Sequence, residues 1–283
     1  MKFTVITPCR NAEGLIQDTI RSLTQQTILS IDLGHELEYI LVDGSSEDKT
    51  VEVAQAAWVE RPNATMTIIS EPDQGMYDAL VKGFKVPSSS DVVSYLNAGD
   101  YYSDNCLAVV GAAFSIPELE WLTGMWVVYT KMGGIFGAKV PWQYSRDLIR
   151  RGYHGVHGSG ASIQQESTFW RRSLLNGVSM DALKDLRYAG DLYLWSRFAK
   201  SHELYVAAAH LGGFRYHGNH LSQVQNLYRE EALRFINREK LSGPLLGLLH
   251  KVAGCVPPSI RIRLRIAKRL VAYEIESDTW KLH

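Results

Sequence analysis

The chain has 283 residues, with 30 Lys or Arg and 30 Asp or Glu, so its formal net charge at pH 7 is zero. A balanced charge gives no overall field of the kind that favours nucleic acid, and we expect no nucleic-acid partner. Cys9, Cys106 and Cys255 are too few and too scattered for a disulfide framework or a zinc site, which fits a reducing cytoplasm. No apolar run reaches the roughly 18 residues of a membrane helix, and the amino terminus does not resemble a signal peptide.

The first hundred residues alternate between short apolar runs and segments of helical periodicity. The runs predict strands over 3–7, 38–42, 65–70 and 92–96. Helices are expected between them over 15–23, 49–58 and 76–84, the first after Asn11 and the second capped by Asp48. This order is typical of an α/β fold, with a mostly parallel sheet and helices on both faces.

Each predicted strand is followed by a polar loop. The loops span 7–11, 43–46, 73–78 and 97–100. In an open α/β sheet the carboxyl ends of the strands form the ligand site, so these loops are expected to meet there. There is neither a Gly-x-Gly-x-x-Gly after the first strand nor a P-loop, so the dinucleotide fingerprint and the phosphate-binding loop are unsupported.

Several segments resemble glycosyltransferase family 2. They are "TVITPCRNAEGLIQDTIRSLTQQT", "EYILVDGSSEDKT", "SEPDQGMYDALVKGF", "SYLNAGD", "QQESTFWRRSLL", "YAGDLYLWSRFAK" and "GGFRYHGNHLSQ". The resemblance, which extends to bacterial polysaccharide and colanic-acid-type enzymes, implies a Rossmann-like GT-A catalytic domain over 1–225. Residues 1–100 would form the nucleotide-sugar-binding half and 101–225 the acceptor-binding half.

The same resemblance implies the donor-side residues. They are Thr7, Pro8, Arg10, Asp43, Asp73, Gly75, Lys82, Asn97, Ala98, Gly99 and His217. Asp43 would accept a hydrogen bond from the nucleotide base, with helix capping as the alternative. Asp73 would reach the ribose or the base. Lys82 would either pair with Asp78 or contact phosphate.

Asp100 is the expected principal ligand of Mg²⁺ or Mn²⁺, because a carboxylate beside an amide suits a hard cation that bridges phosphate oxygens. Many family members carry an aspartate where Asn97 stands. His217 matches a residue that contacts the metal or the diphosphate, and Arg215 and His220 are further phosphate donors nearby.

Asp191 stands where the family holds its catalytic base, at the start of a helix over 190–198. An ordinary helix cap is the alternative. Many members have an acidic residue immediately before this aspartate, where this chain has Gly190. On the acceptor side we expect Gln165, Glu166, Trp170 and Arg197, with Trp170 either stacking on a sugar or buried, and with 164–172 running into a helix.

The remaining segments give weaker signals. We expect a strand-like run within 119–129 and a hairpin or mobile loop over 131–137. Residues 146–157 are expected to be either a flexible segment over the donor diphosphate or a solvated loop. Residues 226–283 are expected to be a helical extension. Within it, apolar and basic residues over 259–271 predict an amphipathic helix that either contacts a membrane surface peripherally or packs on the catalytic domain.

Together these features predict a metal-dependent inverting transferase of hexosyl or related groups, on the cytoplasmic side of a membrane or free in the cytoplasm. The donor would be a UDP or GDP sugar, and the acceptor a saccharide or lipid-linked saccharide in bacterial surface polysaccharide or glycolipid assembly. A nucleotidyltransferase and a non-catalytic nucleotide- or sugar-binding protein are the alternatives.

Overall fold

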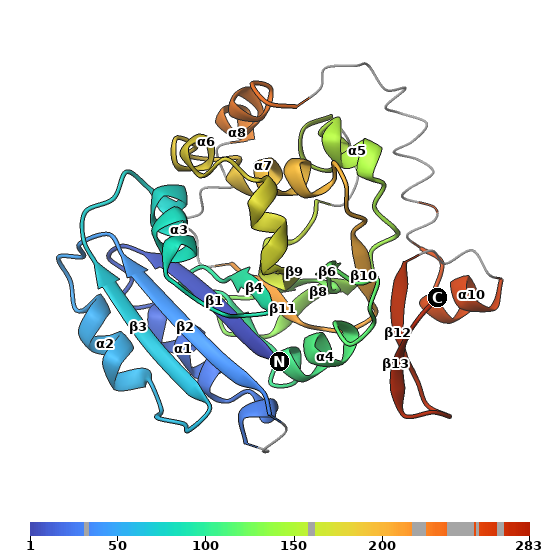
Figure 1. Cartoon of the computed structure of the whole chain (residues 1–283), viewed down its shortest axis with the longest axis horizontal. Helices are drawn as coiled ribbons and strands as arrows, with labels where there is room; N and C mark the ends of the chain where they lie inside the picture. The colour runs from blue at the N-terminus through green and yellow to red at the C-terminus, as the bar shows by residue number, and fades with distance from the viewer. Residues whose placement is uncertain (31–33, 158–161, 217–224, 237–251, 253–254, 265–268) are drawn as a thin grey trace.

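The computed structural model describes residues 1–30, 34–157, 162–216, 225–236, 252, 255–264 and 269–283. Its centre is a nine-stranded sheet of order β13-β12-β10-β6-β9-β4-β1-β2-β3 (Figure 1). The strands are β1 (Lys2–Cys9), β2 (Glu36–Asp43), β3 (Ala64–Ser70), β4 (Val92–Tyr95), β6 (Trp121–Thr123), β9 (Thr168–Arg171), β10 (Tyr205–Ala207), β12 (Leu270–Glu274) and β13 (Thr279–Leu282).

Helices cover both faces of this sheet (Figure 1). One face carries α1 (Ile16–Thr24), α2 (Thr50–Ala57) and α4 (Cys106–Ala113). The other carries α3 (Met76–Lys85), α6 (Met180–Lys184) and α7 (Gly190–Phe198). Further helices are α5 (Arg146–Arg150), α8 (Gln225–Ala232) and α10 (Pro258–Arg263), with short helical turns at Thr27–Leu29, Tyr153–His157, Gln165–Ser167 and Arg172–Gly177.

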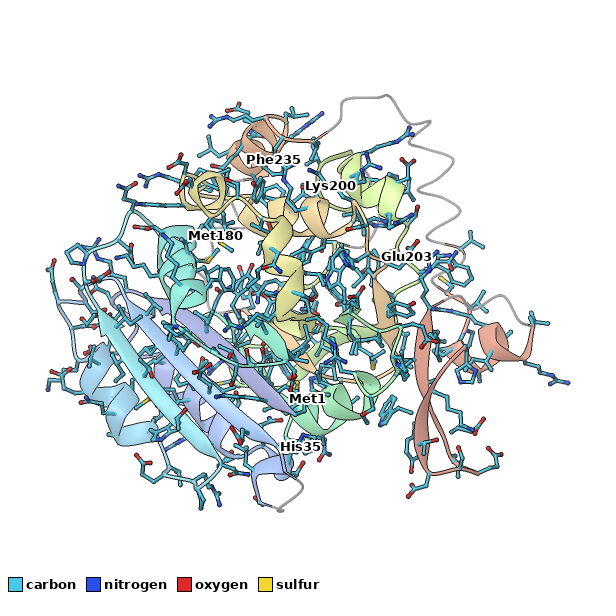
Figure 2. The ribbon with its side chains drawn as sticks, in the orientation of Figure 1. Met1, His35, Met180, Lys200, Glu203 and Phe235 are labelled. Atoms are coloured by element: carbon cyan, nitrogen blue, oxygen red, sulfur yellow. The ribbon has the colours of Figure 1, made fainter. Side chains whose placement is uncertain are left out.

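Strict alternation along β1 and β2 divides the core in two. Val5 and Leu41 point into the cluster with α1, α2 and α4, whereas Ile6 and Ile40 point into the cluster with α3 and α7. Successive strand residues face opposite sides, so apolar residues at adjacent positions require helices on both faces. At the amino ends of these strands Met1 and His35 lie side by side (Figure 2).

The predicted strand–helix alternation of the first hundred residues is confirmed. Strands β1, β2 and β3 pair in parallel, and β4 pairs in parallel with β1, so these four carboxyl ends share one edge. Only the end of the first strand differs, since Pro8 lies inside β1 rather than after it.

A second, four-stranded sheet of order β5-β11-β7-β8 stands beside the first. Its strands are β5 (Tyr101–Tyr102), β7 (Trp126–Tyr129), β8 (Ile135–Lys139) and β11 (Gly212–Arg215). Strands β7 and β8 form the hairpin expected over 131–137. Because β5 directly follows Asp100 and β11 pairs with it, this sheet brings residue 215 to the mouth of the main sheet.

Two local predictions are wrong. Residues 168–171 form β9, which runs antiparallel between β4 and β6, and not the start of a helix. The flexible segment or solvated loop expected over 146–157 contains α5 and a helical turn. A run as short as Thr168-Phe-Trp-Arg171 fits either a strand or a helix, and its pairing with β4 and β6 makes it a strand here.

The C-terminal extension is not wholly helical, and the single basic amphipathic helix predicted over 259–271 is wrong. Helix α10 ends at Arg263, and Leu270 and Val271 are buried in β12, which pairs with β10 of the main sheet. Their apolar side chains stabilise the protein core and are not available to a membrane surface. Among the described residues, no helix combines the length and apolar character needed to cross a bilayer.

Candidate active site

The first two polar loops hold each other through reciprocal hydrogen bonds. The backbone N–H of Asn11 donates to Ser46 Oγ (2.7 Å), and the Asn11 side chain accepts from the N–H of Glu47 (2.9 Å). The N–H of Ala12 donates to Thr50 Oγ1 (2.7 Å). Asn11 has a φ of 50°, which asparagine tolerates better than most residues. These bonds fix the entrance between β1 and β2.

Asp43 lies at the end of β2 with no exposed surface. Its carboxylate accepts from the N–H of Ser46 (3.1 Å) and from Ser70 Oγ (2.6 Å), so it ties β2 to β3. Asp48 instead accepts from the N–H of Thr50, the first residue of α2 (3.0 Å). The residue at the N-cap position of α2 is Lys49, so Asp48, predicted as the cap, binds the start of the helix from one residue before the cap.

The third loop approaches the second so closely that position 44 needs glycine. A Cβ on Gly44 would lie 2.4 Å from Asp73 Oδ2. Asp73 also accepts from the N–H of Gly75 (2.9 Å), whose φ of 134° is open mainly to glycine. Asp43 and Asp73, predicted to bind the nucleoside, are thus in adjoining loops.

The other predicted donor residues occupy different positions around this edge. Thr7 and Pro8 are buried within β1, beneath the loops. Arg10 is exposed and pairs loosely with Glu47 (3.9 Å). Arg10 is therefore the one of these three residues that is open to an incoming nucleotide.

Lys82 does not pair with Asp78, so that alternative is wrong. Its ammonium donates to the Pro72 carbonyl (2.6 Å) and lies 3.0 Å from Glu71, which braces the third loop. Asp78 is buried and lies 3.8 Å from Lys184 of α6. Lys82 is thus engaged by the protein in this structure.

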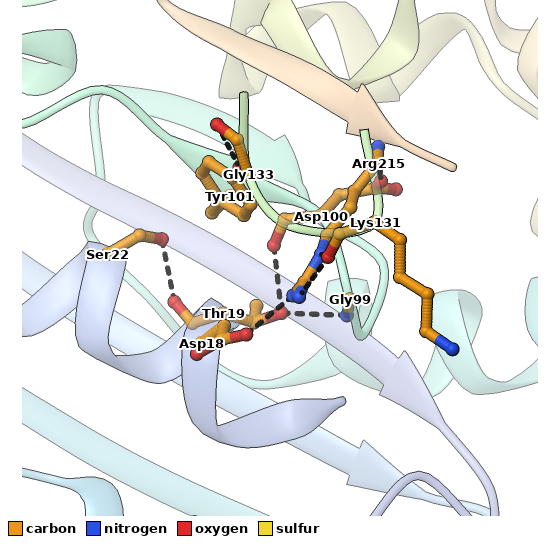
Figure 3. Close-up of polar contacts among 9 residues, drawn as sticks. All are labelled: Asp18, Thr19, Ser22, Gly99, Asp100, Tyr101, Lys131, Gly133 and Arg215. Carbon is orange, nitrogen blue, oxygen red and sulfur yellow. Dashed lines mark hydrogen bonds and ion pairs between the residues drawn. The ribbon is translucent and has the colours of Figure 1, made fainter. Parts of the chain in front are cut away.

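Asp100 and Arg215 join three distant segments (Figure 3). Asp100 is only 4% exposed; its carboxylate accepts from the Arg215 N–H (2.8 Å), and its carbonyl accepts from Thr19 Oγ1 (2.8 Å). The Arg215 guanidinium donates to Asp18 (2.5 Å) and to the Lys131 carbonyl (2.8 Å). Arg215 therefore braces the site and does not extend into it as a phosphate donor.

The surroundings of Asp100 fit a divalent cation. Burial and then the charge of Glu166 raise the pKa of Asp100 well above its usual range. Asn97 Oδ1 is buried without a hydrogen-bond partner in the described structure, while its Nδ2 donates to Gln165 Oε1 (3.3 Å). A carboxylate and an unpartnered amide oxygen are the donors that Mg²⁺ and Mn²⁺ prefer.

Gly99, with a φ of 101°, provides the tight turn between Asn97 and Asp100, and Ala98 lies half-buried within it. The other predicted metal ligand, His217, and the nearby His220 lie outside the described residues. Within the described residues, no group of three His, Cys, Asp or Glu side chains surrounds a common point. The described residues alone thus supply few ligands for a metal.

Asp191 lies in the first turn of α7 and is not its cap, since the cap residue is Ala189. The Asp191 N–H donates to the Tyr77 hydroxyl (3.2 Å). Its Oδ1 accepts from the N–H of Leu192 (2.7 Å) and from the Tyr228 hydroxyl (3.1 Å). Burial raises the pKa of Asp191 to about 6.

Glu166 interacts electrostatically with both Asp100, the predicted metal ligand, and Asp191, the predicted base. It is 8% exposed, and burial, together with the charge of Asp191, raises its pKa to about 7. The adjacent Gln165 donates its amide to the Tyr95 carbonyl and accepts from Asn97. The structure thus brings Gln165 and Glu166 to the side of Asp100, and Glu166 also to Asp191.

Two predicted acceptor residues lie away from the site. Trp170 is fully buried in the core, with its ring 5.6 Å from that of Trp195, so it cannot stack on a sugar. Arg197 lies over the ring of Tyr193 (4.6 Å). It follows Asp191 by six residues, and at 3.6 residues per turn such a side chain points away from the carboxylate.

Comparisons with known proteins find relatives among glycosyltransferases. A stretch of 113 residues is 30% identical to a "PGL/p-HBAD biosynthesis glycosyltransferase" of Mycobacterium tuberculosis and covers 39% of this chain and 40% of the relative. Another of 95 residues is 30% identical to the "Undecaprenyl-phosphate 4-deoxy-4-formamido-L-arabinose transferase" of Pseudomonas aeruginosa, covering 34% of this chain and 27% of that protein. The chain thus matches less than half the length of these relatives.

Solved structures share the fold. S. aureus TarS 1-349 in complex with UDP-GlcNAc superposes with a TM-score of 0.54 at 18% identity, covering 92% of this chain and 69% of that one. M. tuberculosis glucosyl-3-phosphoglycerate synthase gives a TM-score of 0.55 at 16% identity, with coverages of 84% and 82%. The model of the family "Glycosyl transferase family 2" matches residues 4–201, and with the GT-A fold described above, this chain belongs to that family.

Proposed function

We propose that this protein is a metal-dependent, inverting glycosyltransferase that moves a sugar from a nucleoside diphosphate to an acceptor hydroxyl. One observation carries the proposal. Asp191, a carboxylate fixed at the start of α7 with a pKa of about 6, shares Glu166 as an electrostatic neighbour with Asp100, at the mouth of the sheet. A base and a phosphate-side carboxylate on one site are what single displacement needs.

The donor would bind over the first three loops. Asp73 would accept a hydrogen bond from the ribose or the base, and Arg10 has the exposure to reach a charged group of the donor, whereas Asp43, which is fully buried, would support the loops beneath the nucleoside. The donor would be a UDP or GDP sugar. UDP-GlcNAc is the ligand named for the TarS complex, which supports a uridine donor here only through the shared fold.

A divalent cation would be held by Asp100 and Asn97 Oδ1, with His217 as a further ligand. When bound, the cation neutralises the charge that develops on the departing diphosphate.

Asp191 would take the proton of the acceptor hydroxyl as its oxygen attacks the anomeric carbon. The new carbon–oxygen bond forms on the face opposite the diphosphate, the bond to the diphosphate breaks, and the configuration inverts. At pH 7 a pKa of about 6 leaves the carboxylate about nine-tenths ionised, yet basic enough to accept a proton.

The acceptor class is proposed from the relatives' names. One relative is named for PGL/p-HBAD biosynthesis, and the other for transfer to undecaprenyl phosphate. We propose a saccharide or lipid-linked saccharide acceptor, in the assembly of a surface polysaccharide or glycolipid.

The test combines binding with turnover. Melting temperatures are measured with UDP, GDP and their sugars, with and without Mn²⁺, because a ligand of the folded state raises the melting temperature. Asp191→Asn should keep the nucleotide-dependent shift and lose transfer, whereas Asp185→Asn, on an exposed residue nearby, should retain both. Turnover by Asp191→Asn would refute the assigned base, and nucleotide binding without transfer by the wild type, across donors and acceptors, would favour a non-catalytic binding protein.

A further inference from the structure

Helix α8 reaches Asp191 from a segment that follows it by about 35 residues. The Tyr228 hydroxyl donates to Asp191 Oδ1 (3.1 Å), and the N–H of Leu192 donates to the same oxygen (2.7 Å). Three residues further along α8 and on the same face is Glu231. Both polar side chains of this face therefore point at the beginning of α7.

Glu231 holds the turn that carries the base. It is 5% exposed, and its carboxylate accepts from three consecutive backbone N–H groups, those of Arg187 (2.8 Å), Tyr188 (2.7 Å) and Ala189 (2.7 Å). Hydrogen bonds to an ionised acceptor are roughly twice as strong as neutral ones. The turn immediately before α7 is thus anchored to α8.

Apolar contacts seat α8 beside these polar ones. The ring of Phe235, just beyond α8, meets that of Tyr193 on α7 edge to face at 5.3 Å (Figure 2). A small buried cluster joins the two helices: Ala189, Leu192, Ala232 and Ile236. Apolar packing alone would suffice to attach a helix. The buried carboxylate of Glu231 and the hydroxyl of Tyr228, which bonds to Asp191, therefore need another explanation.

On the basis of the proposed role of Asp191 as base, we infer that Tyr228 and Glu231 are positioning residues for transfer. Glu231 fixes the turn from which Asp191 projects. Tyr228 fixes the carboxylate by binding Oδ1, so that Oδ2 faces the acceptor hydroxyl. Helix α8, which lies beyond the family match at 4–201, therefore belongs to the working site.

The same contacts set the titration of the base. The titratable groups facing Asp191 come from α3, β4, the turn before β9 and α8: Tyr77, Tyr95, Glu166, Tyr228 and Glu231. The hydrogen bond from Tyr228 favours the ionised form and lowers the pKa of Asp191, whereas the charge of Glu231 raises it. Removing the hydroxyl alone should raise the pKa of the base.

The decisive variant is Tyr228→Phe, which keeps the ring and removes the hydroxyl. The acidic limb of kcat should move upward by about one pH unit from about 6, so that kcat falls about fivefold at pH 6 and less than twofold at pH 8. KM for the donor should not change. Tyr193→Phe is the control, because it removes a buried hydroxyl from α7 that bonds to Ser179 and not to Asp191. A profile for Tyr228→Phe that coincides with wild type would overturn the inference.

Glu231→Gln tests the turn, with Glu230→Gln, on the exposed side of α8, as its control. We expect at least a tenfold fall in kcat, with KM for the donor unchanged and with partial recovery in Glu231→Asp. A donor KM that rises in step with the fall in kcat would contradict positioning. Should Glu231→Gln fail to fold, Tyr228→Phe decides alone. Turnover by Asp191→Asn would refute the proposed base, whereas an inactive Asp191→Asn with an unaltered Tyr228→Phe profile would refute only this inference.

Discussion

Gly190→Ala tests the packing of Tyr77, on α3, against the turn that carries Asp191, the proposed base. A Cβ at this position would lie 2.4 Å from Cδ1 and Cε1 of Tyr77, and 2.7 Å from Cγ. The ring cannot easily move, because it is 2% exposed and its hydroxyl bonds to the Tyr188 carbonyl (3.3 Å) and to the Asp191 N–H (3.2 Å). To restore an ordinary contact, the ring or the turn must shift by roughly 1 Å.

The expected magnitude follows from three terms. Alanine in place of a helical glycine normally stabilises by about 0.5–1 kcal/mol. Overpacking costs about 1–3 kcal/mol, and weakening the two hydrogen bonds costs about 1 kcal/mol each. The net loss in the free energy of unfolding is about 2–4.5 kcal/mol, which lowers the melting temperature by about 4–9 °C in a chain of this size. A displacement of about 1 Å at the base should reduce kcat by about 100-fold.

Thermal unfolding and steady-state transfer are measured on the same preparations. Gly14→Ala is the matched control, because nothing lies within 4 Å of its added Cβ, and it should stay within about 0.5 kcal/mol of wild type. For a chain of this size, 1 kcal/mol corresponds to about 2 °C in melting temperature. A Gly190→Ala protein that melts within about 1 °C of wild type and keeps its kcat would refute the reasoning. The same contact explains why position 190 does not carry the acidic side chain that the family resemblance led us to expect.

Four further predictions concern three charged side chains, those of Asp191, Asp100 and Asp43. Since Asp191 must be ionised to act as a base, kcat should fall about tenfold per pH unit below its pKa of about 6, and a flat profile from pH 5 to 8 would contradict this. Because the pKa of Asp191 is raised, the folded chain binds this proton more tightly than the unfolded chain does. The contribution of protonated Asp191 to stability should therefore decline as pH rises from 3.8 to about 6. Denaturant unfolding of wild type and of Asp191→Asn across this pH range should show the difference. Asp100→Asn should remove the Mn²⁺-dependent part of the nucleotide-induced thermal shift; a shift of wild-type size would exclude Asp100 as a ligand. Asp43→Ala should destabilise by about 2–4 kcal/mol in denaturant unfolding, because it leaves the Ser46 N–H and the Ser70 hydroxyl without their acceptor, and a loss below 1 kcal/mol would mean that water replaces it.

The sequence predicted the first half of the fold well because its signals are local there. Strands β1 to β4 are short apolar runs, each followed by a polar loop, and parallel strands buried on both faces read in this way. Strand β9 was missed because its four residues are too few to distinguish the period of a strand from that of a helix. Its identity depends on partners such as Val93 and Trp121, which are dozens of residues away.

The helix predicted over 259–271 was wrong for a related reason. Apolar and basic residues alternate before and through Leu270 and Val271, and this pattern satisfies both a helix face and a strand of period two. Only the open edge of β10, which β12 covers, favours the strand. The periodicity of a sequence cannot show that a sheet edge elsewhere in the fold is available for pairing.

Sequence motifs pointed to the proposed reacting groups of the site but not to the residues that support them. Asp100 and Asp191 follow from short sequence patterns. Tyr77 and Tyr228 reach Asp191 across 114 and 37 residues, so no local spacing marks them. The order of residues in Tyr228-Arg-Glu-Glu231 is ordinary for a solvated helix, and burial of Glu231 is the property that distinguishes it.

The reciprocal bonds between Asn11, Ser46 and Glu47 limit how these loops, proposed here to bind the nucleotide, can change over evolutionary time. The N–H of Asn11 donates to Ser46 Oγ, and the side chain of Asn11 accepts from the N–H of Glu47, so these groups already have partners across the two loops. A single substitution in either loop leaves a hydrogen-bond donor or acceptor without its partner. Only a compensating substitution in the opposite loop restores the hydrogen bond. Preference for one nucleotide base over another should therefore drift by paired replacements, and these two loops should co-vary among relatives more strongly than either varies alone.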